Sequence, residues 1–306
     1  MSLAQTAFVF PGQGSQAVGM GQELCETFPV ARALAAEADD ALGFSLSRLI
    51  REGPETELRR TANTQPAILL VSVAAYRALG LEPAAVAGHS LGEYSALVAA
   101  GALSFRDAIV LVHKRGQYMQ DAVPEGHGVM LALIGIETET IAAAVADDGG
   151  EVDIANYNAP GQVVIAGTRE AAHRVAAACG ARQAIELPVS APFHCRLMRP
   201  AEERLRADLA QVAFSELRIP LYNNVDARRV TSGAEARDGL SRQVSRPVRW
   251  VELVQRMIAD EGVRRFVEVG PGTVLSGMLR RIDRSVERLA ACDPASIDAL
   301  RTRFAD

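Results

Sequence analysis

A serine framed by two glycines, between a short apolar run and a helix, most constrains how this chain folds. Ser90 is the centre of Gly88-His-Ser-Leu-Gly92, a G-x-S-x-G pentad. The apolar run 84–87 predicts a buried strand, and 91–100 predicts a helix because it contains no proline and no β-branched cluster. The two glycines let strand and helix approach without Cβ clashes. So tight a turn strains the serine backbone and exposes its hydroxyl, which favours a nucleophile; the alternative is a serine that caps the helix.

Composition and charge narrow the class of protein. At 306 residues the chain can form one sizeable domain that carries a smaller insert. Its net charge of −5 gives no general attraction to nucleic acid or to an anionic membrane. The four cysteines are scattered, without metal-binding spacing, so we predict reduced thiols and no metal site. No apolar stretch reaches membrane-spanning length and no signal peptide precedes the first strand, so we expect a cytoplasmic protein.

Most of the chain alternates helices with short apolar strands. A strand is predicted at 6–10, and helical segments follow from 19 to 79 with breaks at Phe28-Pro29, Gly43 and Gly53-Pro54. A further helix is predicted at 104–122, and strands at 220–224, 265–269 and 286–291. Such alternation is typical of a mostly parallel sheet covered by helices.

Between residues 126 and 192 the pattern changes. Strands are predicted at 129–135, 151–158, 162–167 and 182–189, and helices at 137–146 and 169–179. The order β-α-β-β-α-β is that of a ferredoxin-like subdomain. We therefore predict an α/β core with a small α+β insert, and a site between them.

A nucleophilic serine needs a base within hydrogen-bond reach, and the chain has five histidines. His194 is the preferred candidate because it follows the insert and is predicted to open a helix that runs to about 212, with Pro192 in its first turn. The positive end of a helix dipole would keep its imidazole neutral and able to accept a proton near pH 7. No acidic third residue stands out, so we predict a dyad with Ser90, its imidazole oriented by a carbonyl. Surface or structural roles are favoured for the other histidines: His89, His113, His127 and His173.

Arg115 interrupts an apolar face. On the predicted helix 104–122, Ala108, Leu111, Val112 and Met119 follow the i, i+3, i+4 spacing of a core stripe that also includes Arg115. A buried guanidinium needs an anionic partner. Two partners remain open at this point, an internal Asp or Glu or the carboxylate of a ligand in bidentate geometry.

The loop Pro11-Gly-Gln-Gly-Ser-Gln-Ala also matches the dinucleotide fingerprint G-x-G-x-x-A at Gly12, Gly14 and Ala17. Its context argues against that interpretation, because the region 32–42 is predicted as helix where a second strand with an acidic end is needed. A glycine-rich loop after the first strand can instead lend a backbone N–H to an oxyanion.

Several motifs occur together in a fixed order across nearly the whole chain. They resemble those of the malonyl-CoA:acyl-carrier-protein transacylases, within the acyltransferase family of fatty acid and polyketide synthesis. The motifs are Phe10-Pro-Gly-Gln-Gly-Ser-Gln, Gly88-His-Ser-Leu-Gly-Glu-Tyr-Ser-Ala-Leu, Lys114-Arg-Gly-Gln-Tyr-Met-Gln-Asp-Ala-Val-Pro-Glu-Gly, Asn156-Tyr-Asn-Ala-Pro-Gly-Gln-Val-Val-Ile-Ala-Gly, Ser190-Ala-Pro-Phe-His-Cys-Arg-Leu-Met and Val267-Glu-Val-Gly-Pro-Gly.

The resemblance implies a fold and a set of roles. The fold is an α/β hydrolase-like core formed by residues 1–125 and 194–306, with a ferredoxin-like insert at 126–193. The implied roles are Ser90 as nucleophile, His194 as base, Arg115 as the partner of malonate's free carboxylate, the backbone N–H groups of Gln13 and Leu91 as the oxyanion hole, and Gln243 as a support near His194. Phe193 resembles the residue that selects malonyl over methylmalonyl in related polyketide acyltransferases.

The resemblance also implies an activity. It is ping-pong transfer of a malonyl group from malonyl-CoA, through a serine ester, to the phosphopantetheine thiol of an acyl carrier protein. No cofactor or metal is expected, and the protein is expected to be a monomer. Alternatives are a free-standing acyltransferase that loads a polyketide synthase or malonate decarboxylase carrier, a serine thioesterase, and an NAD-dependent oxidoreductase that rests only on the Gly12 loop.

Overall fold

A parallel-rich sheet forms the centre of the protein. In this computed structural model, which describes residues 3–124, 126–181 and 183–305, six strands pair in the order β10-β9-β1-β2-β7-β8. All neighbours from β10 to β7 are parallel, and β8 is antiparallel to β7 at the edge. The strand bounds are β1 Thr6–Phe10, β2 Ala85–Gly88, β7 Leu221–Tyr222, β8 Arg229–Val230, β9 Arg265–Val269 and β10 Glu287–Ala291.

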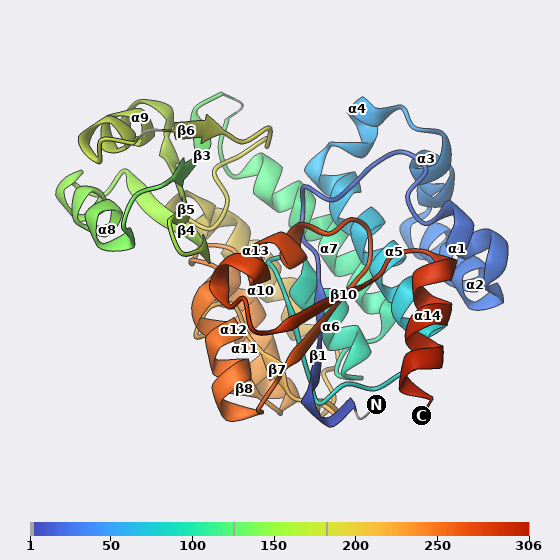
Figure 1. Cartoon of the computed structure of the whole chain (residues 1–306). Coiled ribbons are helices and arrows are strands. Elements are labelled where there is room, and N and C mark those ends of the chain that lie inside the picture. Colours follow the sequence, from blue (N-terminus) through green and yellow to red (C-terminus); the bar gives the residue numbers. More distant parts are fainter. Residues whose placement is uncertain (1–2, 125, 182, 306) are drawn as a thin grey trace.

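Helices cover both faces of this sheet (Figure 1). Alternate residues of β1 face opposite layers, as expected for a strand of period two: Phe8 and Phe10 pack with α5, α6 and α7, and Ala7 and Val9 with α12 and α13. The helix bounds are α1 Gln22–Thr27, α2 Pro29–Leu42, α3 Leu46–Glu52, α4 Glu55–Leu58, α5 Thr61–Leu79, α6 Gly92–Ala99, α7 Phe105–Asp121, α10 Arg199–Ala210, α11 Gly233–Gln243, α12 Trp250–Asp260, α13 Val274–Ile282 and α14 Pro294–Phe304, with short 3-10 turns at Leu3–Gln5 and Arg196–Met198.

The segment between α7 and α10 forms a second, antiparallel sheet with its own apolar core, which lies apart from the main sheet in Figure 1. Its strands pair in the order β4-β5-β3-β6, which is the ferredoxin-like arrangement, with two helices on one face. The bounds are β3 Gly128–Ile134, α8 Thr138–Asp147, β4 Val152–Ala159, β5 Gln162–Thr168, α9 Arg169–Ala178 and β6 Gln183–Glu186.

Edge strand β4 ties the small sheet to the core. Asn156 forms a parallel bridge with Val248, where Tyr157 donates its N–H to the Val248 carbonyl at 2.9 Å and Val248 donates to the Ala155 carbonyl at 2.8 Å. Val248 lies between α11 and α12 of the core. Backbone hydrogen bonds therefore join the small sheet to the segment of the core between α11 and α12.

The predicted fold class is confirmed, with local differences. The last strand of the insert is shorter than 182–189 because it pairs with β3 only over Gln183 to Glu186, and the predicted first residue, Arg182, lies outside the described residues. The edge strand β8 was not predicted, since two residues carry no periodic signal. The exact division of the chain at 126 and 193 stays a prediction, and residue 125 is outside the described part. Among the described residues, no helix combines the length and the apolar character that a membrane span requires.

Candidate active site

Ser90 lies on a sharp turn between β2 and α6, with φ of 52° in the left-handed region. The turn needs its two glycines: a Cβ on Gly88 would lie 1.9 Å from the carbonyl carbon of Gly92, and one on Gly92 would lie 2.1 Å from the Phe10 carbonyl oxygen. The Asn224 side chain bridges the turn. Its Oδ1 accepts the Ser90 N–H at 2.6 Å, and its Nδ2 donates to the Gly88 carbonyl at 2.6 Å. The strain predicted for this serine is therefore present and supported by neighbouring groups.

His194 meets the Ser90 hydroxyl directly. Its Nε2 lies 2.7 Å from the Ser90 Oγ, and its Nδ1 lies 2.9 Å from the backbone carbonyl of Gln243. A carbonyl can only accept, so Nδ1 carries the proton and Nε2 presents a lone pair to the hydroxyl. The capping alternative for Ser90 is wrong, because no side-chain hydrogen bond caps α6 and the hydroxyl pairs with His194 instead.

The local setting of His194 differs from the predicted helix start. The residue precedes the 3-10 turn Arg196–Met198 with φ of 59°, and α10 begins only at Arg199, with Pro200 rather than Pro192 in its first turn. A residue in the left-handed region cannot continue a right-handed helix. Burial, and then the charge of Arg115, lower the pKa of His194 to about 3, so the ring is neutral at pH 7 for a different reason than the predicted dipole.

Arg115 reaches the same hydroxyl from α7. Its guanidinium, only 1% exposed, donates through Nη1 to the Gln65 Oε1 at 2.7 Å and through Nη2 to the Gln243 Oε1 at 2.9 Å and the Ser90 Oγ at 3.2 Å. Its Nε is buried without a hydrogen-bond partner. Across 3–124, 126–181 and 183–305 no carboxylate forms an ion pair with it. Of the two partners that the sequence left open, the internal Asp or Glu is therefore not the one found.

Gln243, at the end of α11, connects these groups. Its side chain is fully buried, accepts from Arg115, and donates through Nε2 to the Ser90 carbonyl at 3.0 Å and to the Glu93 Oε2 at 2.9 Å. Its backbone carbonyl is the group that orients His194. The structure thus brings Gln243 to the dyad, an approach that nothing in the sequence itself indicated.

Two backbone N–H groups beside Ser90 are uncommitted. Those of Gln13 and Leu91 donate no hydrogen bond to any described residue, and both residues line the same cavity as Ser90. The loop after β1 lies against the serine turn because the His89 N–H donates to the Phe10 carbonyl at 3.0 Å. These are the donors expected to bind an oxyanion.

The cavity around Ser90 has a volume of 230 Å³ and lies between the core and the insert, as predicted. The core supplies the reactive groups, and β3, β4 and β5 of the insert supply the opposite wall, including Met130, Asn156 and Asn158. Phe193 is buried and lines the cavity next to His194. Its position is compatible with steric selection of the acyl group.

The other histidines lie outside the Ser90–His194 pair. His89 hydrogen-bonds Asn158 Oδ1 through Nε2 at 2.8 Å, and His113 bonds a backbone carbonyl of α5 at 2.8 Å. His127 and His173 are exposed. His89 also lines the cavity around Ser90, whereas the positions of His113, His127 and His173 agree with their predicted surface or structural roles.

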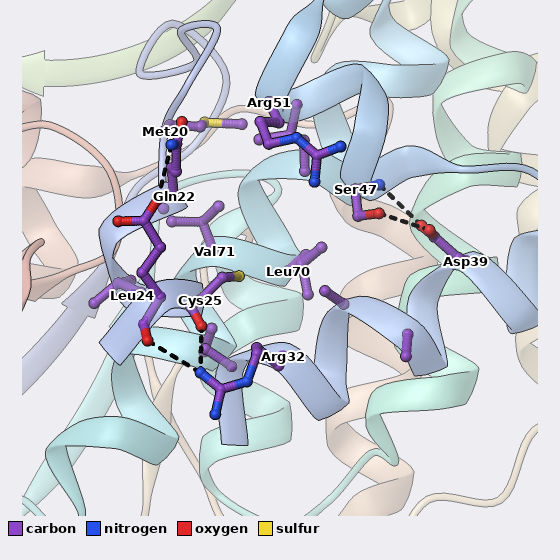
Figure 2. Close-up of a pocket in the computed structure, with 17 residues that line it drawn as sticks. Met20, Gln22, Leu24, Cys25, Arg32, Asp39, Ser47, Arg51, Leu70 and Val71 are labelled. Carbon is purple, nitrogen blue, oxygen red and sulfur yellow. Dashed lines mark hydrogen bonds between the residues drawn. The ribbon is translucent and has the colours of Figure 1, made fainter. Parts of the chain in front are cut away.

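A second, larger cavity of 620 Å³ lies among α1, α2, α3 and α5 (Figure 2). Its lining is mostly aliphatic, with Arg32, Arg51 and Asp39 among the polar exceptions. None of the predicted site residues lines it. It contains no serine paired with a histidine among its lining residues, and we assign it no chemistry.

Comparison with known proteins agrees with this geometry. A family model described as the acyl transferase domain matches residues 7–296. The chain belongs to the acyl transferase family. Among its relatives is a malonyl CoA-acyl carrier protein transacylase of Salmonella typhimurium, 48% identical over 98% of this chain and 100% of the relative.

Solved structures of the acyl transferase family have the same fold. An acyl carrier protein S-malonyltransferase from Vibrio cholerae has a TM-score of 0.94 and 50% identity, covering 97% of this chain and 99% of that one. A malonyl-transacylase in complex with a type II PKS acyl-carrier protein has a TM-score of 0.94 and 45% identity, covering 98% of this chain and 99% of that one.

The dinucleotide interpretation of the Gly12 loop is wrong, because helices α1 to α5 separate β1 from the next strand.

Three residues of the site were missed from the sequence: Gln65, Glu93 and Asn224. Glu93 lies three residues after Ser90, and this nearness is the only signal that could have identified it. Gln65 and Asn224 reach the site only through long-range packing.

Proposed function

We propose that this protein transfers the malonyl group of malonyl-CoA to the phosphopantetheine thiol of an acyl carrier protein. The observation that carries the proposal is Arg115, a buried cation without a carboxylate partner that already contacts the Ser90 hydroxyl. A malonyl group bound at Ser90, first as the thioester substrate and then as the serine ester, would bring its free carboxylate to this guanidinium, which offers the planar fork that carboxylates bind. Relatives that carry the transacylase name at 48% identity support the same activity.

In the proposed first half-reaction, His194 Nε2 removes the Ser90 proton as Oγ attacks the thioester carbon. The C–S bond then breaks, the thiolate of coenzyme A takes the proton from His194, and a malonyl-serine ester remains. The N–H groups of Gln13 and Leu91 would hold the oxyanion, at about 3 kcal/mol per donor. In the second half-reaction the carrier thiol gives its proton to His194 and its sulfur attacks the ester carbon. The C–O bond to Ser90 then breaks, and the Ser90 oxygen takes the proton back from His194.

Because one acyl bond replaces another without a change of oxidation state, the proposal includes no metal or cofactor. The proposal is completed by a monomeric enzyme located in the cytoplasm. A carrier of polyketide synthesis is the second candidate for the acceptor, since a 45% identical relative is named in complex with a type II PKS acyl-carrier protein.

Incubation with malonyl-CoA labelled in the malonyl group tests the proposal. A transferase should retain label on the protein and pass it to a purified holo carrier protein, with the apo carrier as control. Release of free malonate without transfer would indicate a thioesterase. Absence of both would overturn the acyl-serine mechanism. Repeating the second step with fatty acid, polyketide and malonate decarboxylase carriers identifies the acceptor.

A further inference from the structure

A buried carboxylate, Glu93, is linked to the Ser90–His194 pair through Gln243 and Asn224. Glu93, in the first turn of α6, is 1% exposed. Its Oε2 accepts from the Gln243 Nε2 at 2.9 Å and from the Asn224 backbone N–H at 2.9 Å. Its Oε1 is buried with no hydrogen-bond partner in the described part of the chain. A carboxylate taken so far out of water is costly, so a role is needed to explain it.

The two residues that Glu93 holds are the two that hold the dyad. Gln243 orients the His194 ring through its carbonyl and bonds the Ser90 carbonyl through its side chain. Asn224 accepts the Ser90 N–H and so fixes the strained turn. Removal of Glu93 would free both supports at once.

Charge gives Glu93 a second effect. His194 becomes an imidazolium each time it takes the proton of Ser90 or of a thiol, in a buried site that already contains the cation of Arg115. The Arg115 charge lowers the pKa of His194, second to burial. A negative charge in the same low-dielectric environment offsets this repulsion.

We propose that Glu93 is the positioning carboxylate of this site, acting on His194 and Ser90 through Gln243 and Asn224 and supporting the imidazolium by its charge. This inference rests on the proposed function. Glu93 thus serves as an acidic partner of the dyad, although it contacts Gln243 and Asn224 rather than His194 itself.

The titration of Glu93 makes the proposal measurable. Burial raises its pKa to about 7, against the opposing effects of hydrogen bonds from Asn224 and Gln243 and of the Arg115 charge. The other charged or titratable groups facing it are Asp226, which is bound by Arg242 at 2.7 and 2.9 Å, and the neighbouring Tyr94. Since the ionised form supports the base, the rate of malonyl-enzyme formation should rise as pH increases through about 7.

The test is Glu93→Gln, because a glutamine oxygen can accept both hydrogen bonds while its amide takes the unpartnered position of Oε1. The experiment is single-turnover acylation with labelled malonyl-CoA, measured from about pH 5.5 to about pH 9, with a melting curve for each variant. We expect Glu93→Gln to melt near the unsubstituted protein, to acylate about 10- to 100-fold more slowly at high pH, and to lack the rise through neutral pH. This is less than the roughly 10⁴-fold cost of removing a carboxylate that contacts the histidine directly.

Two further variants keep the outcome decisive. Glu93→Asp retains the charge and should recover the rise with pH, at a reduced rate. Asp208→Asn removes a carboxylate that bonds Lys114 and Tyr118 on the outer side of α7, and should leave the pH profile unchanged.

The inference is overturned if Glu93→Gln acylates with the rate and pH profile of the unsubstituted protein, or loses activity only in proportion to folded protein. If Glu93→Gln does not fold, the unsubstituted protein and Glu93→Asp still decide, because a flat profile in both contradicts a role for the charge. Failure of the unsubstituted protein to form a malonyl-enzyme would instead contradict the proposed function.

Discussion

The cavity among α1, α2, α3 and α5 and the smaller cavity around Ser90 differ in what their polar groups do. In the larger one, Arg32 donates to the carbonyls of Cys25 and Glu26 at 2.7 and 3.1 Å, and Asp39 accepts from the N–H and hydroxyl of Ser47 at 2.8 and 2.6 Å (Figure 2). These groups complete helix ends, and Arg32 does so through Nη1 alone. Around Ser90, a cavity of 230 Å³ collects two free N–H groups, a neutral imidazole and an unpaired cation. The combination of a Ser–His pair, two free N–H groups and a cation without a carboxylate partner identifies the site better than volume does.

Backbone strain separates the two regions as well. Among the described residues, the non-glycine residues with positive φ are Ser90, His194 and Ala227, and the first two are the proposed reacting pair. Each such residue costs on the order of 1–3 kcal/mol and persists only where its surroundings impose it. Neither strained residue of the pair lines the larger cavity. Strain is thus concentrated where chemistry is proposed.

The largest effect should follow removal of the reacting groups in the smaller cavity. Ser90→Ala should abolish labelling by malonyl-CoA, because no other nucleophile receives the acyl group, and His194→Ala should slow both half-reactions because one base serves both. Loss of the Ser90 hydroxyl should change the free energy of unfolding by no more than about 1 kcal/mol. Intact-protein mass spectrometry and a melting curve check both points. Normal labelling of Ser90→Ala would discard the nucleophile assignment.

Arg115 tests whether an open cation defines the site. Charge-assisted hydrogen bonds contribute roughly 1.5–3 kcal/mol each, so loss of two in Arg115→Ala should lower kcat/KM for malonyl-CoA by about 10²- to 10⁴-fold. Acetyl-CoA has no free carboxylate, and its transfer should be spared or improved. Arg115→Lys should recover little, since an ammonium lacks the planar fork. Equal losses for the two thioesters would show that Arg115 serves the fold rather than the substrate.

These outcomes bear on residues that local sequence pattern could identify. Ser90 was predictable because strand, turn and helix are contiguous, and Arg115 because a charge interrupts an apolar stripe. Gln65 and Asn224 were not, since their positions depend on packing between segments 50 and 134 residues away from the groups they bind. The helical conformation predicted for His194 was wrong. Its positive φ accompanies hydrogen bonds to the Gln243 and Val244 carbonyls, and these distant contacts leave no local pattern in the sequence.

The same distinction applies to the fold. Strand Thr6–Phe10 and the breaks between α1 and α4 follow from local signals, a run of apolar residues and the positions of glycine and proline. The break at Arg59-Arg60, between α4 and α5, contains neither and was not predicted. The bridge between Asn156 and Val248 joins segments 92 residues apart (248 − 156), so only the tertiary fold brings the two residues together. Local patterns thus predict elements, and long-range packing determines how the insert closes the cavity.

Phe193 should have a smaller, selective effect in the same cavity. A ring beside the base leaves little room for an α-methyl group, so we expect the unsubstituted enzyme to prefer malonyl-CoA over methylmalonyl-CoA. Phe193→Ser should narrow that preference by about 1–3 kcal/mol, the usual value of one methylene in a pocket. The ratio of kcat/KM values for the two thioesters measures it, and Phe193→Leu controls for loss of packing. Equal values in the unsubstituted enzyme would contradict steric selection.

The smallest effect is expected in the larger cavity. Arg32 is exposed and donates to backbone carbonyls at the end of α1. A contact of this type stabilises the folded protein by about 0.3–1 kcal/mol. Arg32→Ala should therefore lower the melting temperature slightly and leave kcat/KM for malonyl-CoA and carrier unchanged. Paired melting curves and both half-reactions provide the comparison. A substantial loss of transfer in a folded Arg32→Ala protein would mean that the larger cavity takes part in function. The contrast between that cavity and the one around Ser90 would then be wrong.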